Sequence, residues 1–382
     1  MKKTLTILLV FTMIISLLTG CGQTNENPSS TGNIDGGSIT SPSGEETSGP
    51  SESNGAATEE PGETDAPRAE ITSLTTNAGA VIELSSLAYQ DVEAGSTVYY
   101  ISDITPEAMV EIYNALGWTP TGKVAVKLST GEPPASNYLR PELIVDLVQL
   151  VDGTIVECNT AYGGSRASTA MHYQVAEDHG FTAIAGFQIQ DENGSMTLPV
   201  EGGVRLSENY VGAAFADYDS YLVLSHFKGH SMAGFGGAIK NISIGLGSSE
   251  GKAWIHSGGT SRTNPWGGEQ DAFCEAMADA GKSVSDYLGN GERIVYINVM
   301  NRLSIDCDCN GNPAEPDMHD IGILASTDPV ALDQACIDLV WVSEGNESFI
   351  SRVENRNGLH TLESGEAIGL GSREYELVPI DG

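Results

Sequence analysis

The chain has 382 residues, with 18 Lys and Arg against 52 Asp and Glu, and its formal net charge at pH 7 is −34. No excess of basic residues is available to displace counterions from phosphates, so the composition excludes nucleic acid as a partner. The same charge excludes adsorption to an anionic membrane surface through a basic patch.

The first twenty residues predict an export signal. Lys2 and Lys3 form a basic start, and the apolar run from Leu5 to Leu18 is too short for a stop-transfer helix. The following Thr-Gly-Cys resembles the end of the lipobox of bacterial lipoproteins, in which the cysteine is acylated. The sequence thus predicts a signal peptide over 1–20, a lipid-bearing (palmitate-type) Cys21, and a membrane-anchored protein that faces outside the cytoplasm.

Residues 21–69 are predicted to form a disordered, acidic tether. Of the 48 residues in 22–69, 31 are Gly, Ser, Pro, Thr or Asn, and Ile34 and Ile39 are the only large apolar side chains. Such a segment cannot bury enough apolar area to offset its conformational entropy. The remaining residues, 70–382, are expected to form the folded domain.

Strand-like and helix-like segments alternate through the folded domain. Short β-branched or apolar runs predict strands at 80–84, 123–128, 154–158, 221–227, 293–300 and 321–325. Capping residues and turns predict helices at 105–117, 141–153, 168–180, 269–288 and 328–341, the last capped by Asp328. This alternation predicts an α/β fold with a mainly parallel or mixed sheet and flanking helices.

The segment 226–256 reverses the local sign of charge. It holds three lysines and three histidines but one acid, and seven glycines lie between positions 229 and 251. Glycines let backbone amides approach an anion closely, and the preceding strand brings this loop to the carboxyl edge of the sheet. We therefore expect the loop to bind a small anionic molecule, although a solvated surface loop has the same composition. The candidate ligand-binding residues are Lys228, Gly236, Gly237, Asn241 and Lys252.

A Cys-Asp-Cys segment is the second candidate site. Cys307 and Cys309, together with His319, could supply three ligands to iron or zinc. A redox-active disulfide within the pair, or two reduced thiols in a turn, remain alternatives. Cys158 and Cys336 lie in apolar runs and are expected to be buried small hydrophobes.

Three other residues have simpler expectations. His172 and His179 lie seven positions apart on one predicted helix, and we expect both to be surface or half-buried rather than ligands. Arg166 could bind a carboxylate ligand or pair with one of the many acids.

Two motif lines, SHFKGHSMAGFGGAIKNISIGLGS and CDCNGNPAEPDMHDIGILASTDPVALDQACIDLV, resemble the prokaryotic family called domain of unknown function 362. The resemblance runs from about Lys123 to about Trp341, and members are often labelled iron–sulfur centre proteins. Many relatives carry a ferredoxin-type C-x₂-C-x₂-C run after the position of His256. Here the matching region, 257–290, holds only Cys274, so a ferredoxin-type cluster is not expected.

A weaker resemblance concerns His230, Lys240 and His256, with Gly-Phe-Gly-Gly before the lysine. This pattern is similar to the nickel-pincer lactate racemase family, which implies that His230 is an acid/base, Lys240 the cofactor anchor and His256 a metal ligand. An assembled organonickel cofactor would not survive export of an unfolded chain, so the cofactor itself is not expected.

Three functions remain open from the sequence. The first is a metal- or redox-centre lipoprotein that binds a small anion, and the second is an isomerase-like enzyme on small carboxylates that uses His230, Lys240 and His256. The third is a lipoprotein that captures an anionic solute without catalysis.

Overall fold

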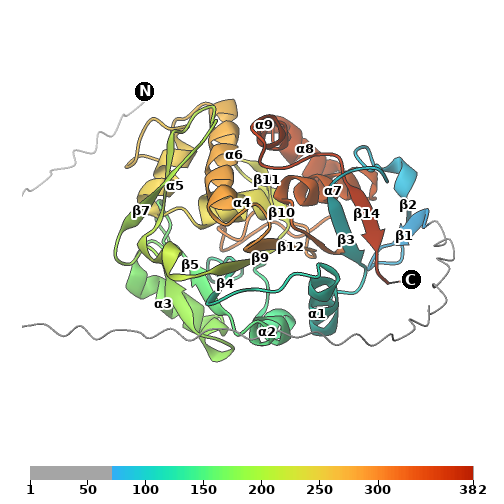
Figure 1. Cartoon of the computed structure of the whole chain (residues 1–382), viewed down its shortest axis with the longest axis horizontal. Coiled ribbons are helices and arrows are strands. Elements are labelled where there is room, and N and C mark those ends of the chain that lie inside the picture. Colours follow the sequence, from blue (N-terminus) through green and yellow to red (C-terminus); the bar gives the residue numbers. More distant parts are fainter. Residues whose placement is uncertain (1–70, 382) are drawn as a thin grey trace, which may run out of the picture. The chain divides into compact units, whose positions relative to one another are not determined.

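The computed structural model describes residues 71–381, so the predicted signal peptide (1–20), Cys21 and the tether lie outside the described residues. Its centre is an eight-stranded sheet in the order β14-β3-β13-β12-β9-β4-β5-β6 (Figure 1). Only β13 runs antiparallel to its two neighbours, and all other pairs are parallel. The predicted α/β class with a mainly parallel or mixed sheet is confirmed. The strands are β3 (Thr97–Ile101), β4 (Val124–Lys127), β5 (Thr154–Glu157), β6 (Phe187–Ile189), β9 (Ser220–His226), β12 (Ile294–Met300), β13 (Gly322–Ser326) and β14 (Glu376–Pro379).

Helices cover both faces of this sheet. One face carries α1 (Pro106–Ala115), α2 (Pro141–Leu150) and α3 (Thr169–Asp178) (Figure 1). The other carries α4 (Ala238–Lys240), α6 (Gln270–Tyr287), α7 (Pro329–Val342), α8 (Glu347–Asn355) and α9 (His360–Ala367). All seven residues of β9 are buried, as expected for a strand covered on both sides. Leu222 and Leu224 join one hydrophobic cluster, whereas Tyr221 and Val223 join the other.

Each predicted strand and helix is present, with small shifts at its ends. The predicted cap of α7 is confirmed, because the Asp328 carboxylate accepts hydrogen bonds from the amides of Val330 (2.8 Å) and Ala331 (3.0 Å). The predicted strand 80–84 is β2 (Val81–Glu83), which pairs with β1 (Ser73–Thr75) outside the central sheet. The structure adds further short elements without a strong sequence signal: β7 (Ser195–Pro199), β8 (Glu208–Gly212), β10 (Lys228–His230), β11 (Gly234–Gly236), α5 (Ser249–His256) and the 3₁₀ helices η1 (Leu84–Ser86), η2 (Phe181–Ala183) and η3 (Ala213–Asp217).

The sheet has a topological switch point between β4 and β9. From β4 the chain continues outward to β5 and β6, whereas from β9 it continues in the opposite direction to β12. Loops diverge at such a point, and this opens a crevice at the carboxyl ends of the strands. Lys127 ends β4, Glu157 ends the adjacent β5, and His226 ends β9.

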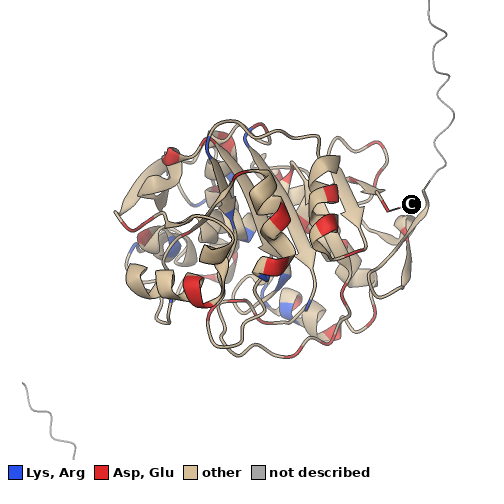
Figure 2. Cartoon of the chain, turned by 90° about the horizontal axis from the view of Figure 1, so that it is seen from below, with Lys and Arg blue, Asp and Glu red and all other residues tan. Residues whose placement is uncertain are grey.

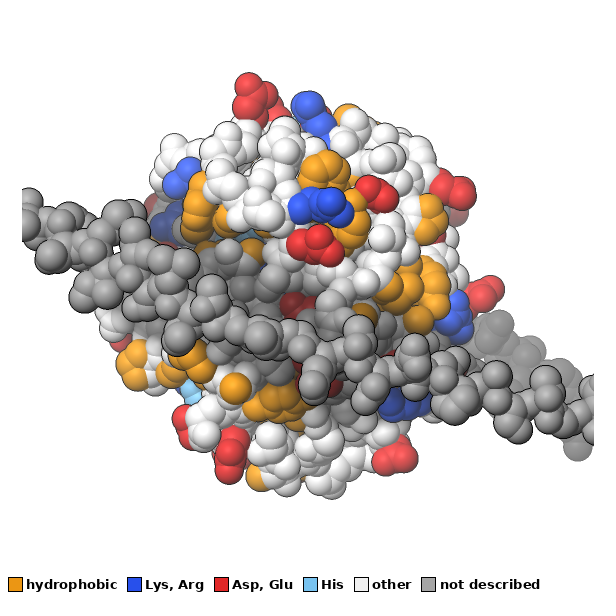
Figure 3. All heavy atoms as spheres, turned by 90° about the vertical axis from the view of Figure 1, so that its left-hand side faces the viewer, with side chains coloured by type: hydrophobic (Ala, Val, Ile, Leu, Met, Phe, Trp, Pro, Cys, Tyr) orange, Lys and Arg blue, Asp and Glu red, His pale blue; other side chains and the backbone are white. Residues whose placement is uncertain are grey.

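On the parts of the face in Figure 3 that the grey atoms leave visible, acidic, basic and apolar side chains are interspersed. Figure 2 shows acidic residues on the outer helices and loops, with few basic ones among them. Among the described helices, none combines the length and apolar character that a membrane span requires.

Candidate functional site

A small cavity of ≈ 50 Å³ lies at the switch point. Five basic side chains line it, in contrast to the acidic composition of the whole chain: Lys127, Arg166, Lys228, Lys240 and Lys252. Further lining groups include hydroxyls, an amide and both cysteines of the Cys-Asp-Cys segment: Ser129, Thr160, Ser225, Asn241, Cys307 and Cys309. The two predicted sites therefore meet in one cavity.

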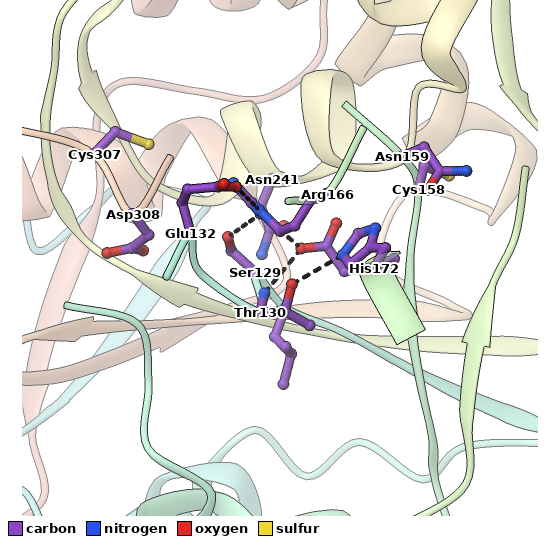
Figure 4. A network of polar contacts seen from close by, with 12 residues as sticks. Ser129, Thr130, Glu132, Cys158, Asn159, Arg166, His172, Asn241, Cys307 and Asp308 are labelled. Atoms are coloured by element: carbon purple, nitrogen blue, oxygen red, sulfur yellow. Dashed lines mark hydrogen bonds and ion pairs between the residues drawn. The ribbon is translucent and has the colours of Figure 1, made fainter. Parts of the chain in front are cut away.

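An ion network holds the basic groups at the ends of β4 and β5 (Figure 4). Glu157 lies 3.9 Å from the Lys127 ammonium and 3.5 Å from the Arg166 guanidinium, and its carboxylate accepts a hydrogen bond from the Thr130 amide. Burial raises the pKa of Glu157, but Lys127, His172 and Arg166 outweigh burial and lower it to about 2. Burial lowers the pKa of Lys127 to about 8.

His172 extends this network and corrects a prediction. Its side chain is fully buried rather than exposed or half-buried, and Nε2 lies 2.9 Å from the Thr130 hydroxyl. Burial lowers the pKa of His172 to about 3, so the ring is neutral near pH 7. His179 is half-buried, as predicted, and stacks on Tyr138.

The β10–β11 hairpin brings His230 to the cysteines. The Gly229 amide donates to the carbonyl of Ser304 (2.8 Å), and a Cβ at position 229 would overlap the backbone of Ile305. Only glycine therefore lets β10 lie directly against the chain that leads into the Cys-Asp-Cys turn. On the other side of this turn, Asp308 O accepts the Glu132 amide (2.7 Å).

His230, Cys307 and Cys309 form a group that could hold a metal ion, because one ligand atom from each lies within 4.8 Å of the others. Two thiolates and an imidazole suit zinc or iron. Three protein ligands also leave a coordination position free for a further ligand.

The two cysteines differ in electrostatic environment. A hydrogen bond from Cys309 lowers the pKa of Cys307 well below its usual value, with Lys240 and His230 adding to the effect against burial. The Lys240 ammonium lies 3.7 Å from Cys307 Sγ. The same hydrogen bond and burial raise the pKa of Cys309. The Lys240 contact therefore favours the thiolate form of Cys307.

His230 has a defined tautomer in this arrangement. Its Nδ1 accepts hydrogen bonds from the backbone amides of Ala233 (2.8 Å) and Met232 (3.2 Å). Nδ1 therefore carries no proton, and in a neutral ring the proton lies on Nε2. Coordination of a metal by Nε2 would move this proton to Nδ1, so residues 231–233 would have to give up these two hydrogen bonds.

Asp308 anchors the turn that carries the two cysteines. Its carboxylate lies 2.9 Å from His226 Nδ1 and 3.4 Å from the Lys228 ammonium, and all three side chains are buried. Burial raises the pKa of Asp308, but His226 and Lys228 outweigh it and the net shift is downward. The ion pairs therefore fix the orientation of the turn between Cys307 and Cys309.

A helix with one wide π turn places the lysine and the amide of the glycine-rich motif. Lys240 ends α4, and the π helix η4 (Asn241–Gly245) follows directly. Asn241 Oδ1 accepts from Lys127 Nζ (2.9 Å), and Nδ2 donates to the carbonyl of Leu224 (3.0 Å). A π turn of this kind is frequent at functional sites.

Comparison with known families identifies the chain. The model for Domain of unknown function (DUF362) matches residues 124–338, which is more than half of the sequence. The chain belongs to the DUF362 family. No curated protein matches it.

Several solved structures resemble the DUF362 chain. The lactate racemase apoprotein from Thermoanaerobacterium thermosaccharolyticum is 14% identical, with a TM-score of 0.37 over 70% of this chain and 61% of that one. A Thermotoga maritima protein is 13% identical, with a TM-score of 0.33 over 69% of this chain and 58% of that one. The DUF362 chain thus aligns with about three fifths of either protein, and its function has to be argued from its own site.

Two of the four predicted metal ligands of the DUF362 chain lie outside the His230–Cys307–Cys309 group. His256 is buried, its Nδ1 lies 2.7 Å from the Lys252 carbonyl, and its ring stacks on Phe273. His319 lines a different cavity, beside Thr76 and Val342. The His256 ring is held by its packing on Phe273, and His319 lies at a different cavity, so neither histidine joins the cysteines.

The predicted ligand-binding residues are brought together in the DUF362 site, and their roles stay predictions. Lys228, Gly237, Asn241 and Lys252 line the cavity. Gly236 contributes space, because a Cβ there would come within 2.9 Å of Lys240 Cδ.

The sequence interpretation missed Lys127, Glu157 and Asp308. A signal for the first two existed: each is a charged residue one position before the end of a predicted strand, 123–128 or 154–158, in a sheet predicted to be mainly parallel. Each is the last residue of the strand that the structure shows. Asp308 was visible within the Cys-Asp-Cys motif, but its partners His226 and Lys228 are more than 70 residues away in the sequence and meet it only in the fold.

Proposed function

We propose that this DUF362 protein holds a transition-metal ion, zinc or iron, with His230, Cys307 and Cys309, and binds a small anionic molecule in the adjoining cavity. One observation carries the proposal: three ligand atoms of the right type lie within 4.8 Å of one another beside a cavity lined by five basic side chains.

The chain's own residues have complementary tasks in this proposal. Two thiolates balance the charge of a divalent ion, so the ion can lie near the Lys240 ammonium without net repulsion. Lys228 and Arg166, held by Asp308 and Glu157, are oriented to bind the anion. The metal, when bound, would supply Lewis-acid or redox chemistry at the open coordination position.

A second candidate function is redox chemistry of the dithiol pair. It is favoured by the proton on His230 Nε2, which is available to a neighbouring thiolate, and by the lowered pKa of Cys307. In that case the two thiols would pass two electrons and two protons to the disulfide of a partner and become a disulfide themselves, and a partner dithiol would reverse the exchange, without any metal. The acid/base role of His230 in an isomerase stays a prediction.

Metal content tests the first proposal. Protein purified without oxygen should contain about one zinc or iron per chain. Cys307→Ser and Cys309→Ser should each weaken metal binding by more than about 100-fold, because each removes one of three ligands. The matched control is Cys274→Ser, whose thiol lies outside the site, near Gln270 (3.5 Å) and the Asn357 carbonyl (3.8 Å).

Stoichiometric metal in Cys307→Ser would overturn the metal proposal. Metal-free wild-type protein whose Cys307 and Cys309 thiols disappear on oxidation and return on reduction would support the dithiol function instead. Metal-free protein with thiols that do not react would contradict both.

A further inference from the structure

The charges around the cavity do not balance. Among residues 71–381, three of the five lining cations have carboxylate partners: Lys127 pairs with Glu157, Arg166 with Glu132 and Glu157, and Lys228 with Asp308. These pairs use all three carboxylates, and Asp308 is shared with His226. They leave Lys240 and Lys252.

Lys252 is buried, and its ammonium contacts only neutral oxygens in the described part of the chain. It donates to the carbonyls of Gly247 (2.6 Å) and Cys158 (3.3 Å). Burial raises the pKa of Asp191 and the Lys252 charge opposes this shift, but no ion-pair contact joins the two groups, and the Asp191 carboxylate accepts the amides of Asn159 (2.8 Å) and Ser249 (3.0 Å). Lys252 therefore has no carboxylate in direct contact within the described residues, and a buried charge without one is costly.

Lys240 has Cys307 Sγ, at 3.7 Å, as its nearest polar partner in the described structure. When a divalent metal neutralises the two thiolates, as the proposed function requires, Lys240 also lacks a counter-charge. The loaded site then presents two unpaired positive charges, and this step of the argument depends on the proposed function.

The small volume of the cavity, ≈ 50 Å³, favours a compact ligand such as a tetrahedral oxyanion over a longer dicarboxylate. Hydroxyls of Ser129 and Ser225 and the Asn241 amide also line the cavity and can hydrogen-bond to oxyanion oxygens.

We infer that the ligand of the metal-loaded site is a compact oxyanion with two negative charges, of the size of sulfate or hydrogen phosphate, held by Lys240 and Lys252. A monocarboxylate would leave one ammonium unpaired. Phosphate carries a proton that it can donate, whereas sulfate cannot, so comparing the two identifies which oxyanion chemistry the site prefers.

Calorimetric titration of zinc-loaded protein tests this inference. The probes are sulfate, phosphate, formate, acetate and succinate at constant ionic strength, set with sodium gluconate, a monoanion larger than any of the probes. Sulfate or phosphate should bind at least about tenfold more tightly than formate or acetate, because an additional charge pairs inside a low-dielectric site. Succinate should bind more weakly than either oxyanion.

Variants that remove one lysine charge test which lysines produce the preference for dianions. Lys252→Met should reduce the preference for dianions over monoanions by about tenfold. Lys240→Met provides a second variant in case the buried Lys252→Met does not fold. Lys282→Met is the matched control, because this lysine pairs with Asp286 on α6 outside the cavity and its removal should change no affinity.

Equal affinity for formate and sulfate, tighter binding of succinate, or an unchanged preference in both lysine variants would overturn the inference. Zinc content is measured in the same samples. A protein that takes up no zinc contradicts the proposed function, whereas a protein that takes up zinc but prefers monoanions contradicts only the dianion inference.

Discussion

Buried charge at single residues distinguishes this site from the rest of the molecule. Lys127, Glu157 and Arg166 are almost inaccessible to solvent, yet each has a partner of opposite charge. Removing one member of such a network leaves the others buried and unpaired, which is costly. The electrostatics of the site is therefore a property of the whole set of residues.

His172 gives a pH prediction at this scale. Its pKa is lowered by burial from 6.5 to about 3, so between these values the unfolded chain takes up a proton that the folded chain does not. The folded state therefore loses stability as the pH falls through this window, by about 1.4 kcal/mol per pH unit. We expect urea melts to show this in His172→Gln. Between about pH 6 and about pH 5, its free energy of unfolding should fall by about 1.4 kcal/mol less than that of the wild-type protein.

The control for this experiment is His360→Gln. Burial lowers the pKa of His360, but Glu363 and Glu275 outweigh it and the net shift is upward. Its contribution to stability is present below pH 6.5 and is lost above it, so its removal should leave the slope at lower pH nearly unchanged. If the free energy of unfolding of His172→Gln depended on pH as it does in the wild-type protein, His172 would have the same pKa in the folded and unfolded states.

At the scale of elements, replacing each of two helical glycines with alanine should change the stability of the protein in opposite directions. Gly251 lies in α5 against β8, and a Cβ there would overlap the carbonyl oxygen of Tyr210, so Gly251→Ala should destabilise by about 1–3 kcal/mol. Gly281 lies within α6, where a Cβ would be 3.4 Å from Leu370 Cδ2. Gly281→Ala should stabilise by about 0.5–1 kcal/mol, because alanine favours helix.

Thermal and urea unfolding of both variants measure this difference. Because both changes are the same substitution in a helix, the contrast between them isolates the packing of α5 on β8. Equal effects of the two substitutions would show that α5 can move away from β8 at little cost, and the position of Lys252 on α5 would then be less well defined.

Elements with strong patterns were predictable, and those without them were not. The strand ending at His226 and the helix capped by Asp328 follow from an apolar run and a cap-proline pair. The three-residue strands β10 and β11 carry no periodicity, and they form because Gly229 can lie against the chain at Ser304 and Ile305. That contact, which places His230 beside Cys307, has no local signature.

At the scale of the whole molecule, the charge of the chain bears on its attachment to the membrane. A net charge of −34 gives no attraction to anionic lipid, so the proposed membrane location depends on acylation of Cys21. Cells fed a labelled fatty acid should incorporate the label into the wild-type chain and not into Cys21→Ser. Label retained in Cys21→Ser would show that another residue is acylated, and absence of label from both would contradict the proposed anchor.

The sequence by itself determined the α/β class, the family motifs and the two chemistry-bearing segments, because apolar runs, caps and motif spacing are local properties of the chain. Only the tertiary structure decided that these segments form one cavity, that His230 rather than His319 joins the cysteines, and that His172 is buried. The physical reason is that these facts depend on which strand ends meet at the switch point between β4 and β9. That order is set by packing between distant segments, and no single segment encodes it.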